Sequence, residues 1–214
     1  YRMPEVEGGL KVEVEIALVQ FISVSTSNEF IEIEAWWRFY WTDPRLAWNQ
    51  TLWDVDFLTF SSTEIWIPDI IAYEHIEDQA TNTDAQVYPS GLVLKSTPKK
   101  TKIGCPMNLI AFPFDTQECT FTVGSWSRHG NQLDVVPRAK NVSDLLVKGP
   151  ADFPARSSLD MSSYVEFNSW RIDTTKVVWK NTYYACCPEP YPVIIYQLKI
   201  ARSSRTHFSG IIGP

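Results

Sequence analysis

Two adjacent cysteines, Cys186 and Cys187, constrain this chain more than any other feature of its sequence. They lie in a stretch rich in tyrosine and proline, Tyr183-Tyr184-Ala185-Cys186-Cys187-Pro188-Glu189-Pro190-Tyr191. Neighbouring cysteines can bond to each other only through a small strained ring, and the ordinary alternative pairs each with a distant cysteine. The two remaining cysteines, Cys105 and Cys119, make a plausible pair of their own. We therefore predict a vicinal disulfide at the tip of a hairpin, with tyrosines at its base.

Length and composition restrict the class of protein. A chain of 214 residues fits one large all-β domain or two small domains, and we interpret residues 1–214 as a single domain. A hydrophobic share of 44% excludes general disorder. The net charge of −6 argues against nucleic acid as a partner and mildly favours a cationic one. No apolar run approaches the roughly 18–20 residues that a membrane span needs.

Two triplets match the acceptor pattern for N-glycosylation, Asn49-Gln50-Thr51 and Asn141-Val142-Ser143. Such triplets also occur by chance. Together with the expected disulfides, they indicate an oxidising, extracellular setting for a secreted chain. The chain shows no signal-peptide pattern at Tyr1, so we expect it to be already processed or trimmed.

Alternation of apolar and polar residues predicts half-buried strands over Lys11–Phe21 and Phe30–Trp41. In the second run, one face is apolar and the other carries mostly charges. Trp36 lies on the charged face, where an exposed aromatic ring needs a partner surface or a ligand. The alternative is that Trp36 packs beneath a loop.

The rest of the chain also predicts strands. We expect Thr97–Lys102 to be a basic loop and Pro137–Ser163 to be irregular. Further strand-like runs are Leu52–Phe60, Glu64–Ile67, Ala85–Tyr88, Leu92–Ser96, Thr120–Ser125, Tyr164–Ile172, Lys176–Tyr184 and Tyr191–Ala201. About ten strands without a long helix predict an all-β fold, a β-sandwich.

Signatures of catalysis are missing from the sequence. The three histidines are scattered without metal-ligand spacing, and we find neither a glycine-rich phosphate loop nor a nucleophile elbow. We therefore expect no enzyme, no catalytic residue, no metal and no cofactor.

Several motifs together resemble one family. They are Trp41-Thr42-Asp43 with Trp48-Asn49, Trp66-Ile67-Pro68-Asp69, Phe112-Pro113-Phe114-Asp115 between Cys105 and Cys119, and Tyr184-Ala185-Cys186-Cys187-Pro188-Glu189-Pro190-Tyr191-Pro192. In this order they resemble the extracellular domains of Cys-loop receptors, the pentameric ligand-gated ion channels. The last motif is similar to nicotinic α subunits and to the soluble acetylcholine-binding proteins. The similarity runs from about Lys11 to the last strand and implies an immunoglobulin-like β-sandwich.

The resemblance also implies a ligand site between two subunits of a homopentamer. Matching positions on the principal face are Tyr73, Trp126, Tyr184, Cys186, Cys187 and Tyr191. On the complementary face they are Trp36, Gln86, Leu94 and Ser96, the last three resting on an alignment through Gly91. The implied ligands are acetylcholine, nicotine and related cations. Aromatic faces attract an ammonium within about 6 Å by roughly 0.5–2 kcal/mol each, so several rings can replace its hydration.

Some positions depart from the family pattern. The chain starts too late to include the helix that usually precedes the first strand, and Arg128 stands where α subunits usually carry tyrosine. Val193 and Thr122 replace an aspartate and a lysine that help couple binding to gating. This replacement favours a soluble, secreted acetylcholine-binding protein.

Other positions favour a channel. Phe112-Pro113-Phe114 is channel-like, and Arg205–Pro214 resembles the lead-in to a first membrane helix. The alternative is therefore the extracellular domain of a nicotinic-type channel, truncated before that helix. A third possibility, an adhesion module, predicts no affinity for small molecules.

Overall fold

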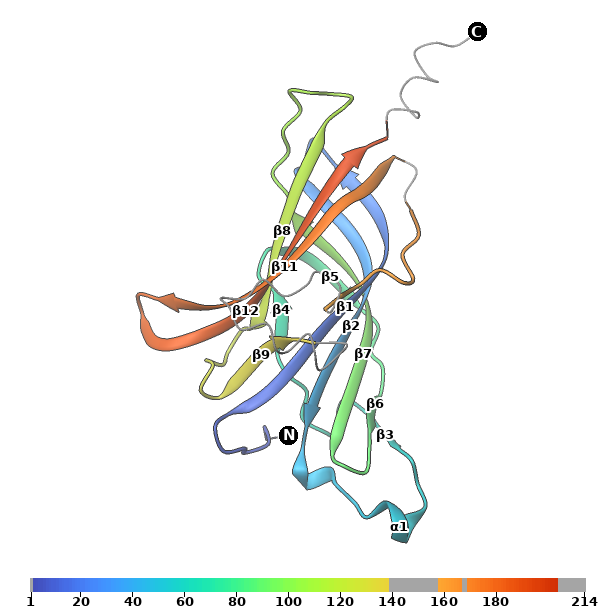
Figure 1. Ribbon diagram of the computed structural model, residues 1–214, viewed down its shortest axis with the longest axis vertical. Helices are drawn as coiled ribbons and strands as arrows, with labels where there is room; N and C mark the ends of the chain where they lie inside the picture. The colour runs from blue at the N-terminus through green and yellow to red at the C-terminus, as the bar shows by residue number, and fades with distance from the viewer. Residues whose placement is uncertain (1, 139–157, 167–168, 204–214) are drawn as a thin grey trace.

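Two β-sheets packed as a sandwich make up the body of the protein (Figure 1). The computed structural model describes residues 2–138, 158–166 and 169–203. An eight-stranded sheet contains β1 (Leu10–Ser25), β2 (Phe30–Thr42), β3 (Leu58–Phe60), β5 (His75–Ala80), β6 (Ala85–Val87), β7 (Leu92–Gly104), β9 (Leu133–Pro137) and β10 (Leu159–Asp160). The four-stranded sheet has the order β11 (Trp170–Tyr184), β12 (Cys187–Arg202), β8 (Thr116–Ser125), β4 (Ile70–Ala72). The predicted β-sandwich is confirmed.

The alternation seen in the sequence determines which face of β2 is buried. Its core-facing residues are Ile31, Ile33, Ala35, Trp37, Phe39 and Trp41, and each is buried. Side chains from the four-stranded sheet meet them, among them Phe121 and Tyr196, whose rings stack at 5.1 Å. Because the apolar faces of two sheets exclude water from each other, this contact supplies most of the driving force for folding.

The basic stretch Thr97–Lys102 was expected to be a loop, and this prediction is wrong. It continues β7, which pairs with β2 on one side and with β5 on the other. The lysines are tolerated there because β5 places acids opposite them. Lys99 Nζ lies 2.5 Å from Asp78, and Lys102 Nζ lies 2.5 Å from Glu77.

Three predicted strands need correction. Most of Leu52–Phe60 is not extended: one helical turn, α1 (Gln50–Trp53), begins after Asn49, and only the last three residues form β3. Glu64–Ile67 forms no strand, and β4 begins only at Ile70. The strand expected from Tyr164 begins at Trp170. Leu52–Val55 and Glu64–Ile67 have strand-like composition but pair with no strand in the described structure, and Val165 makes only an isolated bridge to Gln20, so backbone pairing decides the outcome.

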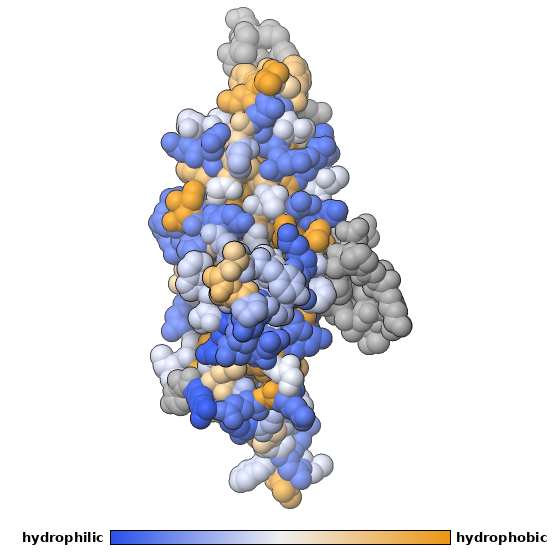
Figure 2. All heavy atoms as spheres, turned by 90° about the vertical axis from the view of Figure 1, so that its left-hand side faces the viewer, coloured by the Kyte–Doolittle hydropathy of each residue, from blue (hydrophilic) through white to orange (hydrophobic). Residues whose placement is uncertain are grey.

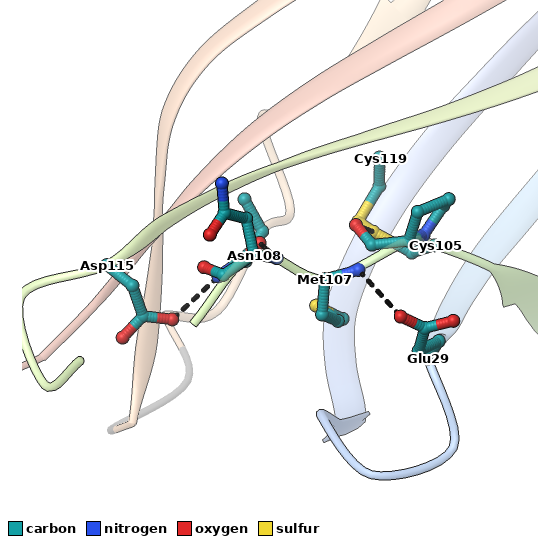
Figure 3. Close-up of a disulfide and its surroundings, with 8 residues drawn as sticks. Glu29, Cys105, Met107, Asn108, Asp115 and Cys119 are labelled. Carbon is teal, nitrogen blue, oxygen red and sulfur yellow. Dashed lines mark hydrogen bonds between the residues drawn. A yellow bond between two sulfur atoms is a disulfide. The ribbon is translucent and has the colours of Figure 1, made fainter. Parts of the chain in front are cut away.

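The disulfide Cys105–Cys119 closes a loop at the end of the molecule where β12 also ends (Figure 1). Both cysteines are fully buried, and the backbone N–H of Cys105 donates to Glu29 O at 2.8 Å. Figure 3 shows Glu29 beside the disulfide, where its side chain also accepts from Met107 N at 3.4 Å. These contacts hold the start of the loop against the turn between β1 and β2.

Buried ion pairing fixes the other end of this loop. Arg202 Nε and Nη2 donate to the two carboxylate oxygens of Asp115 at 2.6 and 2.9 Å. The guanidinium also lies over the ring of Trp170, 4.2 Å from its centroid. Hydrogen bonds from Arg202 lower the pKa of Asp115, although burial opposes this shift. The loop is therefore bound to Arg202, the last residue of β12.

Between these two attachments the loop turns apolar side chains outward. Leu109, Ile110, Phe112 and Phe114 are all exposed, Ile110 to 93%. Figure 2 shows hydrophobic residues gathered at this end of the molecule.

Over the three described ranges, we find no helix long and apolar enough to cross a membrane. Residues 2–9 contain no helix, in agreement with the sequence. Most of the segment expected to be irregular, including Asn141, lies outside the described residues, as does Arg205–Pro214.

Candidate ligand-binding site

The order of strands in the four-stranded sheet brings the predicted principal-face residues together. Tyr73 follows β4, and Trp126 follows β8, which is the neighbour of β4. Tyr184 ends β11, and Tyr191 lies on β12, the other neighbour of β8. The register pairs Gly124 with both Ile71 and Val193, so the three segments meet at one end of β8.

Four rings form two perpendicular pairs at this place. Tyr73 and Trp126 have centroids 6.2 Å apart at 73°, and Tyr184 and Tyr191 have centroids 5.3 Å apart at 75°. Such edge-to-face pairs leave ring faces open, and ring faces carry the negative end of the quadrupole. Trp126 is 71% exposed in this chain. A cation could therefore approach the indole without displacing core residues.

Tyr73 is kept neutral by its surroundings. Burial raises the pKa of Tyr73 to about 12, helped by the phenols of Tyr184 and Tyr191 and by the carboxylates of Asp69 and Glu74. Its hydroxyl donates to Ser125 O at 2.9 Å. Since that proton is already engaged, Tyr73 offers a ligand a ring and an oxygen lone pair.

Asp69 holds the segment that carries Trp126. Its carboxylate accepts hydrogen bonds from Ser125 Oγ at 2.8 Å, from Ser127 N at 2.8 Å and from Ser127 Oγ. Its backbone oxygen accepts from Trp126 N at 3.2 Å. Sequence reasoning used Asp69 only as part of a motif and missed this role. No local signal shows it, because the serines that donate to Asp69 lie more than fifty residues later in the sequence.

The hairpin of β11 and β12 lies over this site and extends sideways from the body (Figure 1). The disulfide between Cys186 and Cys187 is present in its turn, as predicted, with Tyr184 paired to Cys187. Gly130 N donates to Pro190 O at 2.7 Å near the base of the hairpin. A Cβ at Gly130 would lie 3.0 Å from that oxygen and 3.0 Å from Pro192 Cδ, so any larger residue there would have to push the hairpin slightly away.

Two departures from the family pattern, Thr122 and Val193, have contacts of their own in this structure. Thr122 N and Oγ1 donate to the carboxylate of Glu74 at 2.6 and 2.8 Å, and Val193 is buried. The backbone of Tyr73 also donates to Thr122 O at 2.8 Å. The backbone N–H and the hydroxyl of Thr122 are thus bonded to Glu74, in the turn that carries Tyr73.

Arg128 lines a surface hollow on the side of Asp69, and none of the hairpin tyrosines lines that hollow. The hollow has a volume of about 450 Å³ and is also lined by Asp69, Ser127 and the preceding segment, namely Ser62, Thr63, Ile65, Trp66 and Ile67. The backbone N–H of Arg128 donates to Ser125 Oγ at 3.1 Å.

The predicted complementary residues share one face of the other sheet. Cross-strand pairing places Leu94 opposite Gln86, and Ser96 opposite Arg38, two residues from Trp36 on the same face of β2. Trp36 is half-buried, with the guanidinium of Arg38 5.4 Å from its ring. The structure groups these four residues, but on the eight-stranded sheet. One chain therefore carries two separate sets of predicted site residues.

The charge of Arg38 is balanced within the same face. Its Nη1 donates to Glu15 at 3.3 Å and to Asp160 at 3.2 Å. Tyr40 also donates to Glu15, and burial together with this carboxylate raises the pKa of Tyr40 to about 12. Neighbouring carboxylates therefore compensate the positive charge of Arg38 on the face that carries Trp36.

Comparison with known proteins identifies the family. The model of the neurotransmitter-gated ion-channel ligand binding domain matches residues 2–204. The chain belongs to this family. It is 31% identical over 207 residues to the acetylcholine receptor subunit alpha-type acr-16 of Caenorhabditis briggsae, covering 95% of this chain and 38% of that protein. It is 30% identical over 209 residues to the human neuronal acetylcholine receptor subunit alpha-9, covering 96% and 40%.

The rat neuronal acetylcholine receptor subunit alpha-10 is similar to the same degree, with 30% identity, 96% of this chain and 43% of that protein. The chain thus spans about two-fifths of the length of these curated relatives. All three are named as receptor subunits, so the comparisons favour the channel alternative over the soluble binding protein that the sequence first suggested.

Proposed function

We propose that this chain is the extracellular ligand-binding domain of a nicotinic-type receptor subunit, which binds acetylcholine, nicotine and related cations. The observation that supports this most strongly is the cluster of Tyr73, Trp126, Tyr184 and Tyr191, in which an indole stays largely exposed among three phenols. Each ring face can contribute roughly 0.5–2 kcal/mol to an ammonium, depending on its desolvation.

In this proposal the ligand lies between two copies of the chain. Trp126 supplies the main face for the cation, the other three aromatics surround it, and the Cys186–Cys187 hairpin closes over it. The neighbouring copy contributes Trp36, with Gln86, Leu94 and Ser96 around it. The division of the aromatic residues between two sheets supports this arrangement, because a neighbour can complete from outside what one chain leaves open. A closed ring of identical copies, a homopentamer, satisfies every such interface.

The exposed loop of Leu109, Ile110, Phe112 and Phe114 supports a receptor over a soluble protein. An apolar surface of this kind at one end of a domain favours a further apolar partner, such as a membrane-embedded domain of the same subunit. A gene that continues past Pro214 into four apolar spans would agree with this assignment. A stop codon shortly after Pro214 would instead favour the soluble binding protein.

The test of ligand binding is a fluorescence titration with acetylcholine and nicotine. We expect saturable quenching in the wild type and its loss in Trp126→Ala. Trp53→Ala is the matched control, because Trp53 is as exposed as Trp126 but lies on α1, at the other end of the molecule from the Cys105–Cys119 loop (Figure 1). A flat titration of the assembled wild type would refute the proposal.

A mixing experiment tests the interface. Trp126→Ala and Trp36→Ala should each abolish binding when assembled alone. Rings assembled from an equal mixture should regain about a quarter of the sites, since only one neighbour order in four joins two intact faces. No recovery on mixing would place both residues in one chain's site and refute an interface.

A further inference from the structure

The end of the molecule opposite the Cys105–Cys119 loop exposes a second apolar surface, around α1 (Figure 1). Leu52 is 76% exposed and Trp53 is 70% exposed, and Phe57 and Leu58 are also exposed. We call these four residues the end patch. A hollow of about 380 Å³ adjoins it, lined by Arg45, Leu46, Ala47, Trp48, Trp53, Val55, Leu58 and Phe60. Several large apolar side chains exposed together on a soluble protein usually mark a surface that something covers.

The acceptor triplet at Asn49 lies directly beside the end patch. Asn49 is exposed, and its Oδ1 accepts hydrogen bonds from Thr51 N at 3.0 Å and from Thr51 Oγ1 at 2.5 Å. These two bonds fix the orientation of the amide. Within the described part of the chain, no residue accepts a hydrogen bond from its Nδ2, so the nitrogen that glycosylation uses is available.

The geometry points to an N-linked glycan on Asn49 whose first sugars cover the end patch. Asn49 is the N-cap of α1, and the single turn that follows it carries both Leu52 and Trp53, so a glycan attached there starts within one turn of these two exposed side chains. A pyranose ring has a face of C–H groups that can pack on an indole, while its hydroxyls remain in water. We propose that this carbohydrate, and not a protein partner, is what covers Trp53 and Leu52.

The bond chemistry is that of ordinary N-glycosylation. Nδ2 of Asn49 bonds to the anomeric carbon of an oligosaccharide carried on a lipid pyrophosphate. The lipid pyrophosphate leaves, and Nδ2 loses one proton. A hydrophilic branch anchored at the edge of the patch would also block any flat protein surface from docking there, which sets this proposal against association of two copies.

The experiment uses the chain secreted from eukaryotic cells. Mass spectrometry of the peptide that contains Asn49 should find it glycosylated. Asn49→Asp is the matched variant, because the carboxylate can still accept from Thr51 N and Oγ1 but offers no nitrogen. We expect this variant to bind several-fold more anilinonaphthalene sulfonate than the wild type.

Two further variants separate a covering glycan from a general loss of stability. Adding Leu52→Ser and Trp53→Ser to Asn49→Asp should return dye binding to the wild-type value. Asn141→Asp, which removes the other acceptor, should leave dye binding unchanged.

An unglycosylated Asn49 in the secreted protein would overturn the proposal. So would a glycosylated Asn49 whose replacement leaves dye binding unchanged. Reversible self-association of the wild type through the patch, with glycan attached, would overturn it in favour of a second copy. None of these outcomes bears on the ligand site, since no residue of the end patch belongs to it.

Discussion

Cys105–Cys119 and Cys186–Cys187 are two disulfides of one β-sandwich, and they differ in what surrounds them. The first is fully buried, and the loop that it closes is bound at both ends, by Glu29 and by the Asp115–Arg202 pair. The second lies in an exposed turn, closes no loop and has four aromatic rings near its base. We therefore expect the same bond to contribute to stability in one place and, in the proposed ligand site, to the shape of the hairpin in the other.

The largest effect should come from Asp115→Asn at the buried loop. It leaves the guanidinium of Arg202 buried without an ionised partner, which costs about 3–5 kcal/mol in the free energy of unfolding. Urea denaturation measures this loss. A change below about 1 kcal/mol would mean that the pair is not buried from water as described.

The same pair predicts an acid limit. Because the folded pKa of Asp115 lies below its unfolded value of roughly 3.9, its contribution is complete above that pH and disappears as pH falls through the folded value. The wild type should therefore lose stability below about pH 4 more steeply than Asp115→Asn. Parallel pH profiles of the two proteins would contradict this.

Next in size is the loss of the buried disulfide. Cys105→Ala with Cys119→Ala should lower the free energy of unfolding by about 3 kcal/mol, the chain-entropy value for a loop of this length. Thermal unfolding gives the measurement. Cys186→Ala with Cys187→Ala is the internal control, because a bond between neighbours restricts the unfolded chain very little. Equal losses of unfolding free energy in the two double variants would mean that the two disulfides contribute equally to stability.

Within the aromatic cluster, Asp69→Asn should weaken ligand binding. An amide has one acceptor oxygen where the carboxylate has two, so a charge-assisted hydrogen bond to Ser125 or Ser127 is lost, worth about 1.5–3 kcal/mol. We expect a fall in affinity of about ten- to one-hundred-fold in the fluorescence titration. Asp56→Asn, an exposed carboxylate near α1, is the control. Unchanged affinity in Asp69→Asn would show that Trp126 holds its place without this carboxylate.

The smallest effect should follow removal of the exposed disulfide. Cys186→Ala with Cys187→Ala frees the hairpin turn, so binding must order one or two side chains that are ordered beforehand in the wild type. That cost is about 0.5–1.5 kcal/mol for each side chain, or roughly a tenfold loss of affinity. Stability should change by less than about 0.5 kcal/mol. A larger loss of stability than of affinity would reverse the roles of the two disulfides.

The amphipathic parts of the fold were predictable from sequence because burial on one face imposes alternation. β2 was predicted within one residue of its observed end for that reason. Thr97–Lys102 was mistaken for a loop, since the acids that balance its lysines belong to β5, about twenty residues away. The apolar run around Leu52 was mistaken for a strand, since nothing local shows that no partner strand is available.

The candidate site likewise has parts that the sequence predicts and parts that it does not. The resemblance to the family singled out four aromatics, and the structure brings them together because short loops at the ends of neighbouring strands meet once the strand order is given. The role of Asp69 could not be predicted, because it depends on hydrogen bonds to residues more than fifty positions later. The contact of Gly130 with Pro190 is hidden for the same reason. Whether Arg128 lies toward the tyrosines also required coordinates.

Strand β12 has a mechanical consequence. Its 16 residues run without interruption from Cys187 to Arg202, a length of about 50 Å at the usual rise of an extended chain. Pairing with β11 from Tyr191 to Arg202 and with β8 from Val193 to Ala201 stiffens most of this strand, with the hairpin turn at one end and the ion-paired Arg202 at the other. If the hairpin closes over a ligand, β12 would tilt as one body. Its other end, at Arg202, would then move beside the loop closed by Cys105–Cys119.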